Sequence, residues 1–245
     1  MVNDKPLERL IKIFDILNKE YNVHHECEDE HAFKNMMNWA EMEDADIKIL
    51  DYSFVLNQCF GPWRPERQKE IWQKVYKRFK EDCNGDLRNA TDSVDMGFPF
   101  NWQKRRIIDM SKFLNKNKLS FTEFIKETEN MNGLTVRDEF KEILDSITTK
   151  TISTFIRDCL RKDVFPIDTR VHKILSYVGL PVEEDMMVYL SRKVGLNPRV
   201  FERMLYKHYG ERCGKKILSI CRQCPMREYC FYPIFIKSMF EVKLQ

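Results

Sequence analysis

Residues 144–171 read LDSITTKTISTFIRDCLRKDVFPIDTRV, and this stretch combines a polar break, an amphipathic helix and a proline turn. The break comprises residues 146–149, and a helix is expected from Lys150 to about residue 161. Pro166 then ends the helical stretch, because the residue before a proline is driven toward extended backbone. Asp168 stands at the expected start of the next helix, where an aspartate caps free backbone amides. The stretch therefore predicts two helices joined by an extended turn.

The helical pattern continues on both sides of this stretch. Apolar residues recur every three or four positions, which is the period of a helix with one buried face. Such helices are expected at residues 7–17, 66–79, 102–114, 120–129, 136–144, 168–177, 183–194 and 198–209. Residues 21–46 are polar and acidic, and they are expected to form loops with short helices. No segment carries a convincing strand pattern, so the predicted fold class is all-α.

The composition excludes several classes of protein. The longest segment without Asp, Glu, Lys or Arg is residues 52–63, twelve residues, whereas a membrane span needs about 20 apolar residues. The N-terminal sequence MVNDKPLERL carries acidic residues and leads into no long apolar run, so we expect no secretory signal. The 8 glycines among 245 residues argue against Gly-rich nucleotide-binding folds.

The net charge of +3 conceals an asymmetry between the two ends of the chain. Residues 1–50 hold 6 Lys or Arg against 12 Asp or Glu, a net charge of −6. Residues 146–245 hold 18 against 10, a net charge of +8. A basic C-terminal half favours a polyanionic partner, with nucleic acid first, although a solvated basic surface would have the same composition.

Four of the eight cysteines are gathered in the pattern Cys213-x7-Cys221-x2-Cys224-x5-Cys230. Without a secretory signal the compartment is expected to be reducing, so four close thiols indicate a metal centre rather than disulfides. Four thiolates suit either a structural zinc ion or a 4Fe-4S cluster. Zinc modules usually pair two Cys-x2-Cys units, and only one is present here. The spacing therefore favours the 4Fe-4S cluster and leaves zinc as the alternative.

Lys150 and Asp168 are separated so that the chain can bring them together. A helix over residues 150–161 travels about 18 Å, and the extended residues 162–168 can return up to about 23 Å. The positive end of the helix dipole favours a neutral amine at Lys150, and a neutral amine is the nucleophile that forms a Schiff base. A nearby carboxylate could orient that amine. A surface lysine beside a helix-capping aspartate is the alternative interpretation.

Several motifs together resemble the helix-hairpin-helix DNA glycosylases, endonuclease III-like branch. Residues 144–151 are placed like the family's hairpin, and residues 165–171, FPIDTRV, resemble its catalytic-aspartate loop. The ending from Tyr209-Gly210 through Cys230 resembles the family's 4Fe-4S loop. Gly97-Phe98 followed by Lys104 resembles its Gly-Phe … Lys-Ala stretch. The resemblance covers about residues 50–235.

The resemblance implies a two-lobed fold and a repair activity. A six-helix barrel domain of residues 45–155 would end in the helix-hairpin-helix, and residues 1–44 and 156–245 would form the lobe that holds the cluster. The implied enzyme is a bifunctional DNA glycosylase/AP lyase for damaged, oxidised bases. Lys150 would attack C1′ and nick the strand by β-elimination, and Asp168 would be the essential carboxylate. The damaged base must be flipped out of the duplex to be reached.

The resemblance also implies a partner and a set of contacts. The partner would be double-stranded DNA with a damaged base or an abasic site, bound by a monomer in the cytoplasm of a prokaryote or the nucleus of a eukaryote. The candidate DNA-binding residues are Gln58, Ser146, Thr148, Thr149, Arg170, Lys215, Lys216, Arg222 and Arg227. The hairpin departs from the family pattern, because Ser146-Ile147-Thr148 stands where Gly-hydrophobe-Gly is usual, and the first cysteine gap is seven residues rather than six.

Three functions remain open from the sequence. The first is the glycosylase/lyase, and the second is a monofunctional or non-catalytic DNA-binding protein on the same scaffold, as the altered hairpin suggests. The third is a helical interaction module held by a four-cysteine zinc site. A smaller question concerns Trp63, Phe98, Phe100 and Trp102, which could stack on a base or fill a core.

Overall fold

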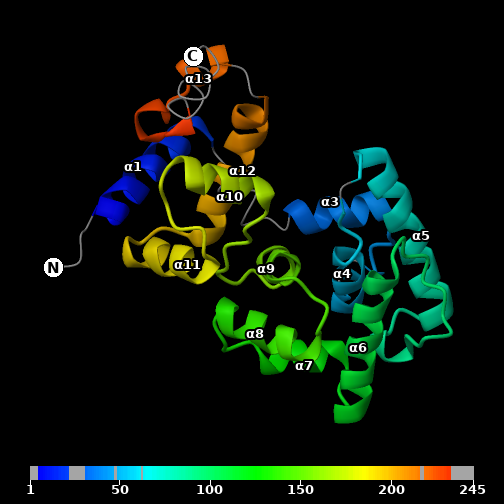
Figure 1. Ribbon diagram of the computed structural model, residues 1–245. Coiled ribbons are helices and arrows are strands. Elements are labelled where there is room, and N and C mark those ends of the chain that lie inside the picture. Colours follow the sequence, from blue (N-terminus) through cyan, green and yellow to red (C-terminus); the bar gives the residue numbers. More distant parts are fainter. Residues whose placement is uncertain (1–4, 22–30, 47–48, 62, 216–217, 233–245) are drawn as a thin grey trace, which may run out of the picture. The chain divides into compact units, whose positions relative to one another are not determined.

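The computed structural model describes residues 5–21, 31–46, 49–61, 63–215 and 218–232. Within these ranges the chain forms helices joined by turns and contains no strand, which confirms the all-α fold class (Figure 1). Among the described helices, none is both long and apolar enough to cross a membrane.

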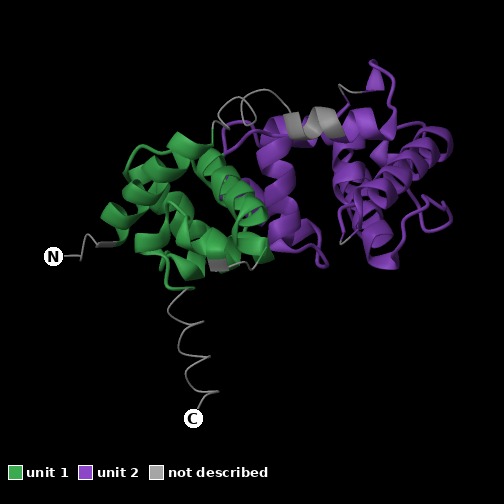
Figure 2. Cartoon of the chain, turned by 90° about the horizontal axis from the view of Figure 1, so that it is seen from above, with its two compact units in different colours: residues 1–27, 163–245 green, residues 28–162 purple. Residues whose placement is uncertain are grey.

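The chain divides into two compact units (Figure 2). Unit 1 is discontinuous and combines residues 1–27 with residues 163–245, whereas unit 2 is the continuous segment 28–162. The division differs from the expected domain boundaries, because residues 28–44 and 156–162 lie in unit 2.

Unit 2 consists of helices whose ends are set by local capping. They are α3 (His31–Ala40), α4 (Leu50–Asn57), α5 (Pro65–Cys83), η2 (Leu87–Asn89), α6 (Asn101–Asn117), α7 (Phe121–Glu127), α8 (Gly133–Ile143) and α9 (Thr149–Asp158). Ser120 and Glu123 form a reciprocal capping box at the start of α7. Asn132 accepts from two amides at the start of α8. Both devices satisfy backbone donors that a helix leaves free in its first turn.

The core of unit 2 is a cluster of phenylalanines from α4, α7, α8 and α9. Phe54 of α4 lies at its centre, with ring centroids 5.1 Å from Phe121, 5.8 Å from Phe140 and 5.4 Å from Phe155. All four residues are fully buried. Burial of each ring contributes about 1.5–3 kcal/mol, so this cluster holds α9 and the hairpin before it against α4 and α8.

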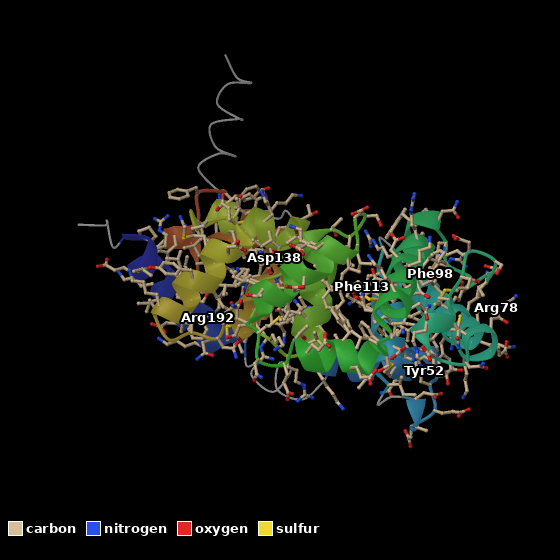
Figure 3. The ribbon with its side chains drawn as sticks, turned by 90° about the horizontal axis from the view of Figure 1, so that it is seen from below. Tyr52, Arg78, Phe98, Phe113, Asp138 and Arg192 are labelled. Carbon is tan, nitrogen blue, oxygen red and sulfur yellow. The ribbon has the colours of Figure 1, made fainter. Side chains whose placement is uncertain are left out.

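The segment before α4 belongs to unit 2 because it packs on α5. The Trp39 ring of α3 lies 5.6 Å from that of Trp72, and Asp46 accepts from the hydroxyl of Tyr76 at 2.7 Å. Tyr52, labelled in Figure 3, packs on α5 as well. Gly85 follows α5 at φ +66, and a Cβ there would lie 2.5 Å from the Tyr52 hydroxyl oxygen. Only glycine fits this turn.

Unit 1 joins the first described helix to the C-terminal part of the chain. Its helices are α1 (Lys5–Glu20), α10 (Thr169–Tyr177), α11 (Glu184–Lys193), α12 (Pro198–Glu211), η3 (Cys213–Lys215), α13 (Leu218–Arg222) and η4 (Arg227–Tyr229). α12 contacts α1, α10 and α11. Phe201 of α12 packs edge-on against Phe14 and Phe165, and these rings form the centre of the core.

Candidate functional site

The hairpin between α8 and α9 is anchored by apolar side chains and capped by a threonine. Leu144 and Ile147 are buried, whereas Ser146 is exposed. Thr148 precedes α9, and its Oγ1 accepts from the backbone amide of Thr151 at 3.3 Å. The hairpin therefore closes with a side-chain cap and without any glycine.

Lys150 is the second residue of α9, in the turn where the helix dipole is most positive. The side chain is half-buried, and its Nζ lies 5.8 Å from the centre of the Phe60 ring. Phe60 in turn packs edge-on against Trp72 of α5, at 5.3 Å between centroids. The Phe60 ring, which is supported by Trp72, thus lies beside the Lys150 amine at the end of the hairpin.

Arg106 of α6 supports the hairpin from inside unit 2. The residue is 4% exposed, and its guanidinium donates to the carbonyl oxygen of Ser146 at 2.7 and 3.1 Å. Its Nη1 lies 3.5 Å from Oε1 of Gln58, and its Cζ lies 4.4 Å from the Trp102 ring. Burial lowers the pKa of this guanidinium, which nonetheless stays charged at neutral pH.

Gln58 lies inside the unit and not on its surface. It is 1% exposed, its amide nitrogen donates to the Phe54 carbonyl at 3.3 Å, and its own carbonyl accepts from Gln103 at 2.8 Å. A DNA contact by Gln58 therefore requires its side chain to leave Arg106 and Phe54. Its role in DNA binding stays a prediction.

Asp168 caps α10 in unit 1. Its Oδ1 accepts from the backbone amides of Arg170 and Val171, both at 2.8 Å, which leaves Oδ2 outside these two bonds. Arg170 is exposed, donates to the Tyr206 hydroxyl at 2.8 Å and lies over the Tyr206 ring at 5.0 Å. Asp168 and Arg170 therefore both lie at the N-terminal end of α10.

Lys150 and Asp168 belong to different units. Lys150 lies in α9 of unit 2, and Asp168 precedes α10 of unit 1. The chain between them ends α9 at Asp158 and runs without further helix to Thr169. The expected helix is thus present, but it ends at Asp158 rather than near residue 161, and a segment without helix follows it. The approach of the two side chains stays a prediction.

The four clustered cysteines are all half-buried and carry no disulfide. Burial raises the pKa of Cys213 to about 12, and the charges of Cys224, Cys230 and Cys221 act in the same direction. The pKa values of Cys224 and Cys230 are raised by burial as well. The thiols are therefore close enough to influence one another, and a cation beside Cys213, Cys224 and Cys230 would be needed to keep those three thiols ionised.

The four cysteines are suitable metal ligands in their chemistry, but their side chains do not lie close enough together to hold a metal ion. Four thiols of one loop are the donors that zinc and iron–sulfur centres use. In the described part of the chain, however, no three His, Cys, Asp or Glu side chains lie close enough together to hold a metal ion. Ligands of a structural metal site are usually drawn together by the metal itself, so the donor set, and not its present geometry, supports the metal assignment.

The cysteine loop is fixed to α10 and α1 at its end. The backbone amide of Phe231 donates to the Tyr177 carbonyl at 2.8 Å. Arg9 of α1 lies 5.0 Å from the Phe231 ring and donates to the Val178 carbonyl. Met226 inside the loop is 1% exposed. These contacts fix the end of the loop against α10 and α1.

His208 of α12 links the loop to α1. The residue is fully buried, its Nδ1 lies 3.2 Å from the Tyr21 hydroxyl, and its Nε2 lies 3.4 Å from Sγ of Cys224. Burial lowers the pKa of His208 to about 4, so the imidazole is neutral at neutral pH. Glu20 pairs with Arg212 beside it. This network has no signature in the sequence beyond the position of His208, five residues before Cys213.

Three of the remaining predicted DNA contacts lie at exposed positions. Lys215, Arg222 and Arg227 are exposed around the cysteine loop, and Arg227 lies 3.5 Å from the carbonyl oxygen of Arg222. Lys216 lies outside the described residues. Thr149 is half-buried at the first position of α9. Their contacts with DNA stay predictions.

Comparison with known proteins finds one curated relative. The chain is 24% identical over 181 residues to an endonuclease III of Sulfolobus acidocaldarius, and the match covers 72% of this chain and 71% of that protein. No family model matches the chain. No solved structure matches it either. The relative supports the endonuclease III-like resemblance noted from the motifs.

Proposed function

We propose that this protein is a DNA glycosylase with AP-lyase activity that acts on damaged bases in duplex DNA. The observation that carries the proposal is the placement of Lys150, half-buried at the end of a capped hairpin and walled by Phe60. Eighteen residues later Asp168 caps the next helix with one carboxylate oxygen. The similarity to an endonuclease III covers the part of the chain that contains Lys150 and Asp168.

Lys150 is the nucleophile in this proposal. The neutral amine bonds to C1′ as the bond from C1′ to the base breaks, and the base leaves with the electron pair and takes up a proton. The amine loses a proton, the sugar ring opens with protonation of O4′, and a protonated imine joins Nζ to C1′. Loss of a proton from C2′ then expels the 3′-phosphate oxygen, which nicks the strand. Water hydrolyses the imine and releases the lysine.

Asp168 stabilises the positive charge that develops on the sugar as the base leaves. Its Oδ1 is held by two backbone amides, so the carboxylate cannot rotate away, and Oδ2 is the oxygen that would face the sugar. Asparagine also caps helices and has the same shape. Replacement by asparagine therefore removes the charge and keeps the helix end.

Cys213, Cys221, Cys224 and Cys230 would hold the 4Fe-4S cluster, with zinc as the alternative. When bound, the metal centre supplies structural order rather than chemistry at C1′. Lys215, Arg222 and Arg227 then meet phosphates from an ordered loop, and their positive charge supplies affinity that is independent of sequence.

The proposal is tested by borohydride trapping on duplex DNA that carries an abasic site. We expect a covalent adduct with the unaltered protein, because borohydride reduces the imine to a stable amine. Lys150→Ala should lose the adduct. Lys150→Arg is the matched control for charge, because it keeps the cation and cannot form an imine. Lys141→Ala, at an exposed lysine of α8, should trap normally.

The outcomes separate the candidate functions. Trapping that persists in Lys150→Ala contradicts the role of Lys150. Base release without trapping would identify a monofunctional glycosylase. Binding of damaged DNA with neither reaction would support the non-catalytic DNA-binding protein, for which the glycine-free hairpin is the motivating observation.

A further inference from the structure

A row of stacked rings lies on the surface of unit 2, beside the hairpin site. The Trp63 and Phe100 rings are 5.5 Å apart between centroids with planes at 22°, and Phe100 and Trp102 are 5.7 Å apart at 16°. The guanidinium of Arg106 continues the row, 4.4 Å from the Trp102 ring. We call Trp63, Phe100 and Trp102 the aromatic shelf.

The shelf differs in geometry from the other aromatic contacts. Among the described residues, the other ring pairs of the chain are tilted or edge-on, as is usual where rings fill a core. The nearly parallel rings of the shelf are displaced sideways by about 4 Å, given a stacking separation near 3.5 Å. Each ring therefore leaves part of its face uncovered. Phe100 and Trp102 are each 41% exposed, so part of each ring is open to solvent.

The charged residues in the two sequence segments that carry the shelf are all basic. Residues 52–65 and 96–108, which carry the shelf, include Arg64, Lys104, Arg105 and Arg106 and contain no Asp or Glu. Arg64 and Arg105 are exposed. Solvent-exposed aromatic rings among basic side chains are typical of proteins that bind single-stranded nucleic acid. The bases stack on the rings, and the phosphates contact the basic side chains.

We propose that the aromatic shelf binds an unpaired nucleobase of a DNA strand by stacking. The inference rests on the proposed action on DNA and adds a second contact to it, separate from Lys150. A strand whose base has left the duplex would present its base to Phe100 and Trp102, with its phosphates beside Arg64 and Arg105. Arg106 holds both Trp102 and the Ser146 carbonyl, so the shelf is joined to the hairpin by one side chain.

The test compares two single strands by fluorescence anisotropy. One is a twelve-nucleotide oligothymidylate, and the other has the same length with its central four nucleotides replaced by reduced abasic sites, which lack a base and cannot form an imine. We expect the first to bind at least tenfold more tightly and to quench tryptophan emission. Trp102→Ala and Phe100→Ala should each weaken oligothymidylate binding by about 5- to 100-fold, the range for one lost base stack. Trp102→Phe should restore most of the affinity, because it keeps a ring.

Trp39→Ala is the matched control. Trp39 is 39% exposed in the same unit, but its ring is tilted at 55° against Trp72 and it lies two residues before Glu41 in the chain. Equal binding of the two strands overturns the proposal, and so does equal loss in Trp102→Ala and Trp39→Ala. Borohydride trapping of the same variants keeps the two ideas apart. Equal binding of the two strands by a protein that still traps overturns the shelf alone, whereas tighter binding of oligothymidylate by the unaltered protein without any trapping overturns the lyase alone.

Discussion

Arg106 places a positive charge in the interior of unit 2, and at the residue scale this is the feature on which the hairpin depends most. Its guanidinium bonds to the Ser146 carbonyl and faces the amide oxygen of Gln58. The run Lys104-Arg105-Arg106 predicts a basic helix surface. Successive helix residues point about 100° apart, however, so one member of such a run faces inward, and composition cannot tell which.

We predict that Arg106→Met lowers the free energy of unfolding by about 2–3 kcal/mol. The substitution keeps most of the apolar volume but leaves the Ser146 carbonyl and the buried amide oxygen of Gln58 without their donor. Arg105→Met, at the exposed neighbouring position, should change stability by less than about 0.5 kcal/mol. Denaturant unfolding measures both. Equal stability of the two variants would show that the guanidinium bonds do not support the hairpin.

At the scale of elements, much of the fold follows from local sequence. The predicted starts at residues 150, 168 and 198 lie within one residue of the observed α9, α10 and α12, because caps and apolar periodicity act within a few residues. Residues 28–44 were expected in the lobe that holds the cluster, whereas the structure groups them with unit 2. α3 packs on α5, and Trp39 and Asp46 meet residues about 30 positions later. Such long-range contacts have no local signal.

The candidate site divides in the same way. Thr148 and Asp168 could be predicted as caps because capping is local. Phe60 beside Lys150, and His208 beside Cys224, could not. These partners come from other elements, and packing brings them together.

The contact between α4 and η2 predicts a pH dependence of stability. Asp51 accepts from the backbone amide of Leu87 at 2.9 Å, and burial raises the pKa of its carboxyl to about 6 from 3.8. The folded state then binds the proton more tightly than the unfolded state, so this group's contribution to stability falls as pH rises from about 4 to about 6.

We therefore expect Asp51→Asn to gain stability relative to the unaltered protein as pH rises. Between pH 5 and 7.5 the difference in unfolding free energy should shift by about 1.5 kcal/mol in favour of the variant. Asparagine keeps an oxygen for the Leu87 amide, so the contact itself survives. Chemical unfolding at the two pH values measures the shift. A constant difference would mean that the carboxyl titrates normally in the folded protein.

At the scale of the whole molecule, the residues proposed to act on DNA are divided between the two units. Lys150, Arg106 and the shelf lie in unit 2, while Asp168 and the cysteine loop lie in unit 1. The cysteine loop contacts α1, α10 and α12 through Phe231, His208 and their partners. A metal bound by the four thiols would therefore order unit 1, and its loss should be felt there first.

We predict that the purified protein carries about four iron atoms per chain, and that Cys224→Ser loses them. Hydrogen exchange should then accelerate in α1 and α12 of unit 1, because the loop no longer holds their ends, and stay unchanged in α4 and α9 of unit 2. Cys83→Ala, at a buried thiol of unit 2, is the control and should keep its iron. Acceleration in both units would show that the chain unfolds as one body.

Zinc without iron would instead support the helical module with a four-cysteine site, because thiolates alone do not decide between the two metals.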